Sequence, residues 1–282
     1  MFLLARDRAL ISLSGVDRQA FLQGLVSNDV AKASPQRALY AAFLTAQGKY
    51  LHDIFIAAFG DRLLIECEAA RRPDLLRRLS LYKLRSQVDL AEENGLLVGL
   101  CFGEGALSSL GLPAKPGRAR AEPGGIVFVD PRLAALGARA YLPASALPAE
   151  TGATADYDRL RISLGVPDGS RDLPVEKAIL LENGFDELNA IDWDKGCYMG
   201  QELTARTRYR GLVRKRLMPV VIEGPAPAFG TPLLLGDKEA GEMRSANGGL
   251  GLALIRLEAL GRGALTSGSA RLIPAKPDWA KF

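Results

Sequence analysis

The feature that most restricts the fold is a change of texture after Arg216. Earlier residues alternate between strand-like and helix-like patterns, whereas later ones form short apolar runs separated by glycine and proline. These runs span residues 217–222, 232–235, 250–255 and 272–273. Short strands with such turns are typical of a small β-barrel. Because 282 residues also exceed the usual size of one hydrophobic core, we expect an α+β region over 1–213 and a β-barrel domain over 214–282.

The first 90 residues predict strands mixed with helices. Residues 39–45 and 50–58 are strand-like on either side of Gly48, which can supply the positive φ of a tight hairpin. Between 103 and 155 the chain is rich in glycine, alanine and proline, and we expect small strands joined by loops there.

Three helices are predicted from apolar spacing and capping residues. The first follows Ser14 and Asp17, with Val16, Ala20 and Leu25 facing inward. The second begins at Pro73 and its apolar pattern runs on to Leu84. The third begins at Thr154 and ends before Pro167.

Composition and charge are those of an ordinary globular protein, with 48% apolar and 24% charged residues and a net charge of +4. Three well-separated cysteines, Cys67, Cys101 and Cys197, argue against a disulfide framework and for a reducing compartment. The first ten residues lack the layout of a secretory signal, and no apolar run approaches the roughly 18 residues of a membrane span. We therefore expect a cytoplasmic protein without a membrane partner.

Several classes of site are excluded by what the sequence lacks. There is no phosphate-binding G-x-x-x-x-G-K-[ST] loop, and no G-x-G-x-x-G follows a strand. His52 is the only histidine, so a Ser-His-Asp or Cys-His group would depend on it alone. Zinc and iron-sulfur clusters need about four ligands, and three dispersed cysteines do not supply them. No intrinsic metal is expected, and Cys67 and Cys101 are interpreted as buried packing residues.

Residues 195–202, with the sequence KGCYMGQE, combine glycine, charge, amide and thiol outside any apolar periodicity. A helix is predicted from Gln201, with Glu202 against its positive N-terminal end. That end and the Lys195 ammonium both favour thiolate over thiol at Cys197, so we expect a nucleophilic cysteine assisted by Lys195. The alternative is a glycine-rich turn with an inert cysteine.

This octapeptide closely resembles the K-G-C-Y-x-G-Q-E signature of the YgfZ proteins, folate-binding proteins that assist iron-sulfur enzymes, including tRNA-modifying ones. The resemblance extends to residues 14–30, 44–56 and 205–217, in order. The wider superfamily includes the aminomethyltransferase, or T-protein, of glycine cleavage. It implies a three-part ring: two interleaved, ferredoxin-like α+β subdomains, divided near residues 90 and 155, and a C-terminal antiparallel β-barrel.

The resemblance also implies tetrahydrofolate, or a reduced one-carbon derivative, as cofactor. Glu182 stands where the superfamily has the glutamate that holds the pterin, and a carboxylate suits the adjacent N–H donors of a pterin edge. Its alternative is a helix-surface acid. Asp53 falls where T-proteins have two acids, but His52 replaces one of them. The remaining cofactor-binding candidates are Trp193 and Tyr198 for stacking, Gln201 and Glu202 in the signature, and Arg206 or Arg208 for the folate's glutamate tail.

The leading hypothesis is thus a folate-binding accessory factor for iron-sulfur enzymes or assembly proteins, not a classical enzyme. Its enzymatic rival is a folate-dependent aminomethyl or one-carbon transferase, which the missing acid beside Asp53 puts in doubt. A third reading is RNA binding by the basic segment 206–216, with Tyr209 stacking on bases. The alternative for that segment is a solvated surface.

Overall fold

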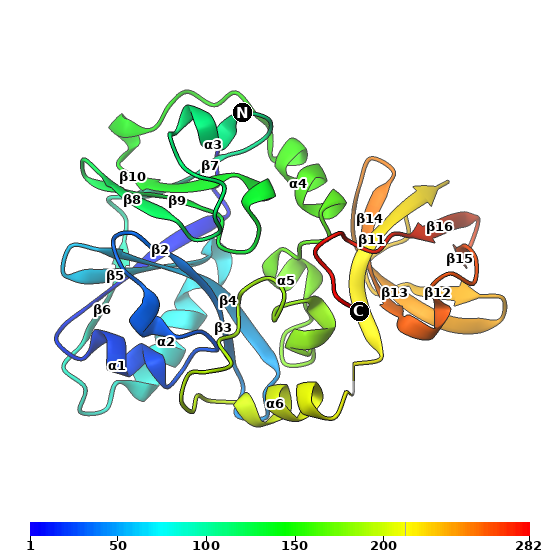
Figure 1. The fold of residues 1–282 in the computed structure, drawn as a ribbon, viewed down its shortest axis with the longest axis horizontal. Coiled ribbons are helices and arrows are strands. Elements are labelled where there is room, and N and C mark those ends of the chain that lie inside the picture. The colour runs from blue at the N-terminus through cyan, green and yellow to red at the C-terminus, as the bar shows by residue number, and fades with distance from the viewer. Residues whose placement is uncertain (212) are drawn as a thin grey trace. The chain divides into compact units, whose positions relative to one another are not determined.

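The computed structural model describes residues 1–211 and 213–282, and its chain divides into two compact units (Figure 1). The first unit comprises Met1–Ala46, Leu51–Thr154 and Leu188–Gln201. The second comprises Gln47–Tyr50, Ala155–Glu187 and Glu202–Phe282. Both units are therefore built from segments that are distant in sequence.

The first unit contains two five-stranded sheets. One has the order β3-β4-β5-β2-β6, with Tyr50 at the start of β4 assigned to the second unit. Its strands are β2 (Arg8–Ser14), β3 (Leu39–Leu44), β4 (Tyr50–Phe59), β5 (Arg62–Glu68) and β6 (Asp89–Glu93). The predicted strands on either side of Gly48 are confirmed, and Gly48 has φ +79°.

The other sheet has the order β1-β7-β10-β9-β8, and its paired strands are antiparallel. Its strands are β1 (Phe2–Leu4), β7 (Leu97–Cys101), β8 (Ala119–Glu122), β9 (Gly125–Val129) and β10 (Ala138–Leu142). The expectation of small strands joined by loops between 103 and 155 is confirmed. The chain crosses between the two sheets twice, from β1 to β2 and from β6 to β7.

The α-helices among the described residues are α1 (Arg18–Gln23), α2 (Arg72–Lys83), α3 (Ala106–Ser109), α4 (Thr154–Ser163), α5 (Gly169–Asp172) and α6 (Gln201–Tyr209). The helix from Thr154 is confirmed, whereas the inward face predicted for α1 is partly wrong. Gly15 turns the chain with φ +100°, so the helix starts only at Arg18. Phe21 and Leu22 are buried, while Val16 is 77% exposed.

The second helix, α2, is shorter than its apolar pattern predicts. Leu75 and Leu79 are buried and anchor it, but the helix ends at Lys83. Leu84 follows at φ +42° and is 87% exposed. The prediction that the helical pattern runs on to Leu84 is therefore wrong, because the backbone leaves the helical conformation at that residue.

The second unit contains the predicted barrel, which is closed in the order β11-β14-β13-β12-β15-β16. Its strands are β11 (Lys215–Glu223), β12 (Pro232–Leu235), β13 (Lys238–Asn247), β14 (Leu250–Arg256), β15 (Leu265–Ser267) and β16 (Ala270–Pro274). Side chains such as Met218, Leu233, Met243 and Leu272 fill its interior. An α+β region followed by an antiparallel barrel is thus confirmed.

Candidate functional site

The loop of residues 195–200, here called the signature loop, is held by its lysine. Lys195 Nζ donates hydrogen bonds to the backbone carbonyls of Gln23, Val26 and Asn28 at 2.8, 2.7 and 2.8 Å. An ammonium group has three N–H donors, so all of them are used. The side chain therefore fastens the loop to the last residue of α1 and to the segment that follows it, about 170 residues earlier in sequence.

Cys197 lies in the middle of the signature loop, and its side chain is exposed. Two residues later the Met199 N–H donates to the Gly24 carbonyl at 3.0 Å. The Tyr82 hydroxyl also donates to Met199 Sδ at 3.0 Å. Gly200 then takes φ +80°, a conformation that glycine adopts readily. The loop thus presents an exposed thiol on a backbone that is held on both sides.

Lys195 lies in a half-buried environment. Burial lowers the pKa of its ammonium to about 8, although the carboxylates of Asp29 and Asp192 favour the charged form. Its Nζ is 5.1 Å from the centre of the Tyr198 ring, within cation–π range. The Tyr198 N–H in turn donates to Gln201 Oε1 at 3.0 Å. Activation of the thiol by Lys195 stays a prediction, while the contacts give this side chain a role in positioning the loop.

Further polar contacts, which the sequence does not indicate, hold the segment before the loop. Ser27 Oγ donates to the Ala190 carbonyl at 2.6 Å, and Asn28 Nδ2 donates to the Asn189 carbonyl at 2.8 Å. Lys32 also forms an ion pair with Asp192. Because each pair is separated by about 160 residues of chain, no local pattern could have indicated it.

The two polar residues of β4, His52 and Asp53, are buried. Asp53 is 2% exposed and accepts a hydrogen bond from the Tyr40 hydroxyl at 3.0 Å. Burial and the nearby Asp53 raise the pKa of that hydroxyl well above its usual value. His52 Nε2 lies 3.0 Å from Asp74 Oδ2, and burial lowers the pKa of His52 to about 4. His52 is therefore neutral at pH 7, and its contact with Asp74 has a structural role.

A buried charged network joins the two sheets of the first unit. Glu66 accepts hydrogen bonds from Arg8 Nε at 2.7 Å and Arg139 Nη1 at 2.5 Å. Asp130 accepts from Arg132 Nη2 at 2.8 Å and Arg139 Nε at 3.1 Å. These arginines hold the pKa of the Asp130 carboxyl below its usual value despite its burial. The network therefore joins the two sheets through buried ion pairs.

Glu182 lies in the second unit, on a short 3-10 helix (Leu180–Asn183). Its side chain is half-buried, and burial raises the pKa of its carboxyl. Four cations of the same unit counteract that shift, Lys215, Lys49, Arg244 and Arg216, in decreasing order of effect. Glu182 is therefore a partly desolvated carboxylate in basic surroundings, not a freely solvated helix-surface acid.

The other predicted site residues are divided between the two units. Trp193 lies in the first unit and is partly exposed. Glu202 and Arg206 are exposed on α6 in the second unit, which confirms the helix predicted from Gln201. In the basic segment 206–216, residue 212 lies outside the described residues. Tyr209 is 76% exposed and contacts Arg208 at 6.0 Å from the ring centre.

The two remaining thiols differ from Cys197. Cys67 is buried, and desolvation raises its pKa to about 12. Cys101 is partly buried, and desolvation raises its pKa as well. The prediction of a buried packing residue is confirmed for Cys67. Within residues 1–211 and 213–282, no group of three or more His, Cys, Asp or Glu side chains could hold a metal ion.

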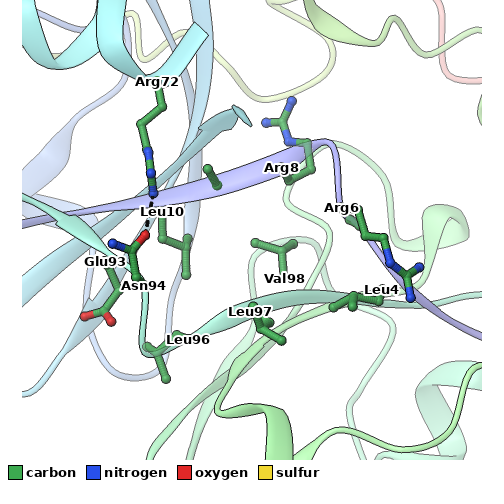
Figure 2. Close-up of a pocket in the computed structure, with 12 residues that line it drawn as sticks. Leu4, Arg6, Arg8, Leu10, Arg72, Glu93, Asn94, Leu96, Leu97 and Val98 are labelled. Carbon is green, nitrogen blue, oxygen red and sulfur yellow. Dashed lines mark hydrogen bonds between the residues drawn. The ribbon is translucent and has the colours of Figure 1, made fainter. Parts of the chain in front are cut away.

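A cavity of about 280 Å³ lies where the chain crosses between the two sheets, and Figure 2 shows the residues around it. Its apolar lining includes Leu10, Leu97 and Val98. Three arginines also line it, and each bonds a carboxylate: Arg6 with Glu150, Arg8 with Glu66 and Arg72 with Glu92. Because these charges are already compensated, the cavity is a poor site for an anionic tail. Among the described residues no helix has the length and apolar character needed to cross a membrane.

Comparison with known proteins finds a family model for the barrel and relatives that span most of the chain. Residues 214–282 match the family model of the CAF17 C-terminal β-barrel domain. The chain is 33% identical over 300 residues to the mitochondrial iron-sulfur cluster assembly factor IBA57 of Mus musculus, covering 96% of this chain and 83% of that protein. The human IBA57 is 33% identical over 301 residues with the same coverage.

A solved structure shows the same fold. The glycine cleavage system aminomethyltransferase T from Bartonella henselae superposes with a TM-score of 0.79 at 14% identity, covering 99% of this chain and 86% of that chain. The predicted T-protein-like fold is confirmed. The relatives are IBA57 proteins, and neither they nor the shared fold single out the YgfZ proteins.

The expected cytoplasmic location is wrong on this comparison, because these relatives are named as mitochondrial proteins. Unpaired cysteines indicate only a reducing environment, which does not identify one compartment.

Proposed function

Because this chain belongs to the family of IBA57 iron-sulfur cluster assembly factors, we propose that it assists the assembly or repair of iron-sulfur clusters in client enzymes. Cys197 is its working thiol, and a reduced folate is its ligand. The clients include tRNA-modifying enzymes, as the YgfZ-like signature implies. The observation that carries this proposal is the exposed thiol of Cys197 on a fastened loop.

The geometry of the signature loop supports a working role for Cys197. An inert cysteine needs no special backbone, yet this one is followed by the bond from Met199 to Gly24 and preceded by a lysine with all three donors in use. Accessibility is a condition for thiol chemistry and for metal ligation. Cys67 does not meet that condition, since it is buried.

The residues around Glu182 suit a reduced folate. A half-buried carboxylate can accept the adjacent N–H donors of a pterin edge, and such charge-assisted bonds gain strength where water is excluded. Lys49 and Lys215 provide positive charge of the kind that a glutamate tail requires. When bound, a reduced folate would supply one-carbon or reducing chemistry, while Glu182 holds and orients the pterin.

The transferase alternative is not favoured. It needs a carboxylate that faces the folate and moves a proton. Asp53 is 2% exposed and its carboxylate accepts the Tyr40 hydroxyl hydrogen bond, so it lies inside the sheet. His52, at the position of the second acid, is neutral and paired with Asp74.

The role of the thiol is tested in cells that lack the chain and express a variant. Cys197→Ala should lower the activity of client iron-sulfur enzymes while the variant accumulates and melts like the wild type, because the side chain is exposed. Cys101→Ala is the matched control and should restore activity. Full activity with Cys197→Ala would remove the thiol from the proposal.

Folate binding is tested by calorimetry with tetrahydrofolate. Glu182→Gln should weaken binding about tenfold or more, since a charge-assisted bond is replaced by a neutral one. Glu239→Gln, an exposed acid of the barrel, is the control. No heat with the wild type would refute folate binding, and an unchanged Kd for Glu182→Gln would refute the assignment of Glu182.

A further inference from the structure

A larger cavity, of about 500 Å³, lies within the first unit on one face of the sheet β1-β7-β10-β9-β8. Figure 1 shows strands of this sheet together with α3. The walls of the cavity are mainly apolar and include Phe2 of β1, Leu110 just after α3 and Leu142 of β10. We call it the sheet cavity. Its volume lies within the range of small-molecule sites.

The sheet cavity exists because small side chains stand in the middle of the sheet. Ala140 of β10 pairs with Val127 of β9 and with Gly99 of β7, and residues paired across strands point to the same face. Ala138, two residues earlier on β10, lies on that face as well. Protein interiors are normally close-packed, and an unfilled apolar space lowers stability. The chain therefore gains from a ligand that fills this space.

The lining residues give the sheet cavity an elongated shape. At one end the Phe2 ring lies over β7, because a Cβ added at Gly99 would be 2.6 Å from Phe2 Cε2. At the other end Arg120 lines the cavity from the edge strand β8, where it pairs with Val127. Three strand spacings separate β7 from β8, which is about 14 Å. An extended, chain-like apolar ligand suits this space.

The β8 end of the sheet cavity carries a net positive charge. Arg120 donates from Nε and Nη2 to one oxygen of Glu122, Oε1, at 2.8 and 2.6 Å. Its Nη1 has no hydrogen-bond partner among the described residues. Arg118, two residues earlier on the same face, forms no ion pair with any residue that the structure describes. Two cations against one carboxylate favour an anionic head group at this end.

We propose that the sheet cavity binds a medium-chain fatty acid such as decanoate. The alkyl chain lies over Ala138 and Ala140, and the carboxylate accepts a hydrogen bond from Arg120 Nη1. Burial of the methylenes supplies the affinity, and the guanidinium fixes the orientation of the ligand. The site includes neither Glu182 nor the signature loop, so this inference goes beyond the proposed function.

The test is calorimetry of the full chain with sodium decanoate, octanoate and hexanoate, each below its micelle concentration. Every loss of two methylenes should weaken binding about tenfold or more, because each buried methylene contributes to affinity. Ala140→Leu fills the middle of the cavity and should weaken decanoate binding at least tenfold. Ala121→Leu is the matched control, since Ala121 is exposed and points to the opposite face of β8. It should bind decanoate normally.

The head-group contact is tested by two substitutions at the β8 end. Arg120→Gln should weaken decanoate binding about tenfold, because a charge-assisted bond is lost. Glu122→Gln removes the competing carboxylate and should bind decanoate at least as tightly as the wild type. An unchanged Kd with Arg120→Gln, or weaker binding with Glu122→Gln, would refute the placement of the carboxylate.

Other outcomes refute the site as a whole. No heat with decanoate, or the same Kd for all three fatty acids, refutes a chain-binding cavity. Normal decanoate binding by Ala140→Leu also refutes it. If the wild type is a dimer and Ala140→Leu makes it a monomer, a second copy of the chain fills the cavity and the fatty acid is excluded. Should Ala140→Leu fail to fold, the chain-length series and Arg120→Gln still decide the matter.

Discussion

Replacing Lys195 by methionine removes the three hydrogen bonds that fasten the signature loop. Methionine keeps most of the side-chain volume and no donor, so the carbonyls of Gln23, Val26 and Asn28 lose their shared partner. A hydrogen bond to a charged group contributes about 1.5–3 kcal/mol when intact. The cost of burying the ammonium, which also lowers its pKa, offsets part of this gain.

Lys195→Met should therefore lower the stability of the closed loop by about 2–4 kcal/mol, because the three part-buried carbonyls recover some hydrogen bonds with water. A loss of about 2 kcal/mol makes local opening of the loop about 30 times more frequent. Native-state hydrogen exchange of residues 195–199 measures that opening, most directly at the Met199 amide, which bonds the Gly24 carbonyl. Urea denaturation measures the free energy of unfolding of the same variant.

Lys195→Arg and Lys115→Met complete the experiment. A planar guanidinium cannot direct three donors from one nitrogen, so Lys195→Arg should open nearly as often as Lys195→Met. Lys115 is exposed, and its replacement should change the free energy of unfolding by less than about 0.5 kcal/mol. The reasoning is refuted if Lys195→Met leaves both exchange and unfolding unchanged.

Three further predictions concern the interior. The free energy of unfolding of the wild type should fall by about 3 kcal/mol as pH falls from 6.5 to about 4, because the unfolded chain protonates His52 while the folded chain keeps it neutral. Urea denaturation at several pH values measures this loss. The variant His52→Asn should lack it. Arg139→Met leaves two buried carboxylates short of a partner and should cost about 3–5 kcal/mol, measured by urea denaturation; a loss under 1 kcal/mol would contradict the network. Gly137→Ala places a Cβ 2.1 Å from the Cys101 carbonyl oxygen at a residue with φ +89°, so it should lower the stability by more than about 2 kcal/mol in thermal melts. Gly24→Ala is the control: no atom lies within 4 Å of the new Cβ, so this variant should melt within a few degrees of the wild type.

Local patterns in the sequence predicted much of the fold. The run at residues 232–235 is β12, and the strands on either side of Gly48 are β3 and β4. The strand β13 was missed because its sequence, KEAGEMRSAN, has few β-branched or aromatic residues. Its place comes from pairing with β12 and β14 in a closed barrel, which is information that lies outside the strand itself.

The sequence could predict which residues belong to the candidate site, but it could not predict the contacts that hold them. The octapeptide singled out Cys197, and the structure shows that its side chain is exposed. The contacts of Lys195 were not predictable, because its three acceptors are backbone carbonyls that leave no mark in the sequence. Arg139 was overlooked for a related reason: arginine is usually exposed, and only Glu66 on another strand and Asp130 make its burial acceptable.

The discontinuous first unit has a consequence for biosynthesis. Its last segment, Leu188–Gln201, carries the signature loop, and the carbonyls that receive Lys195 belong to residues 23–28. During translation, nearly two hundred residues must emerge before the thiol loop can settle on its support. Such non-local closure is slow compared with helix formation. Until the loop closes, the nascent chain carries Cys197 on an unanchored segment, so pulse-labelled chains should expose this thiol to alkylation early and become protected at neighbouring amides only late.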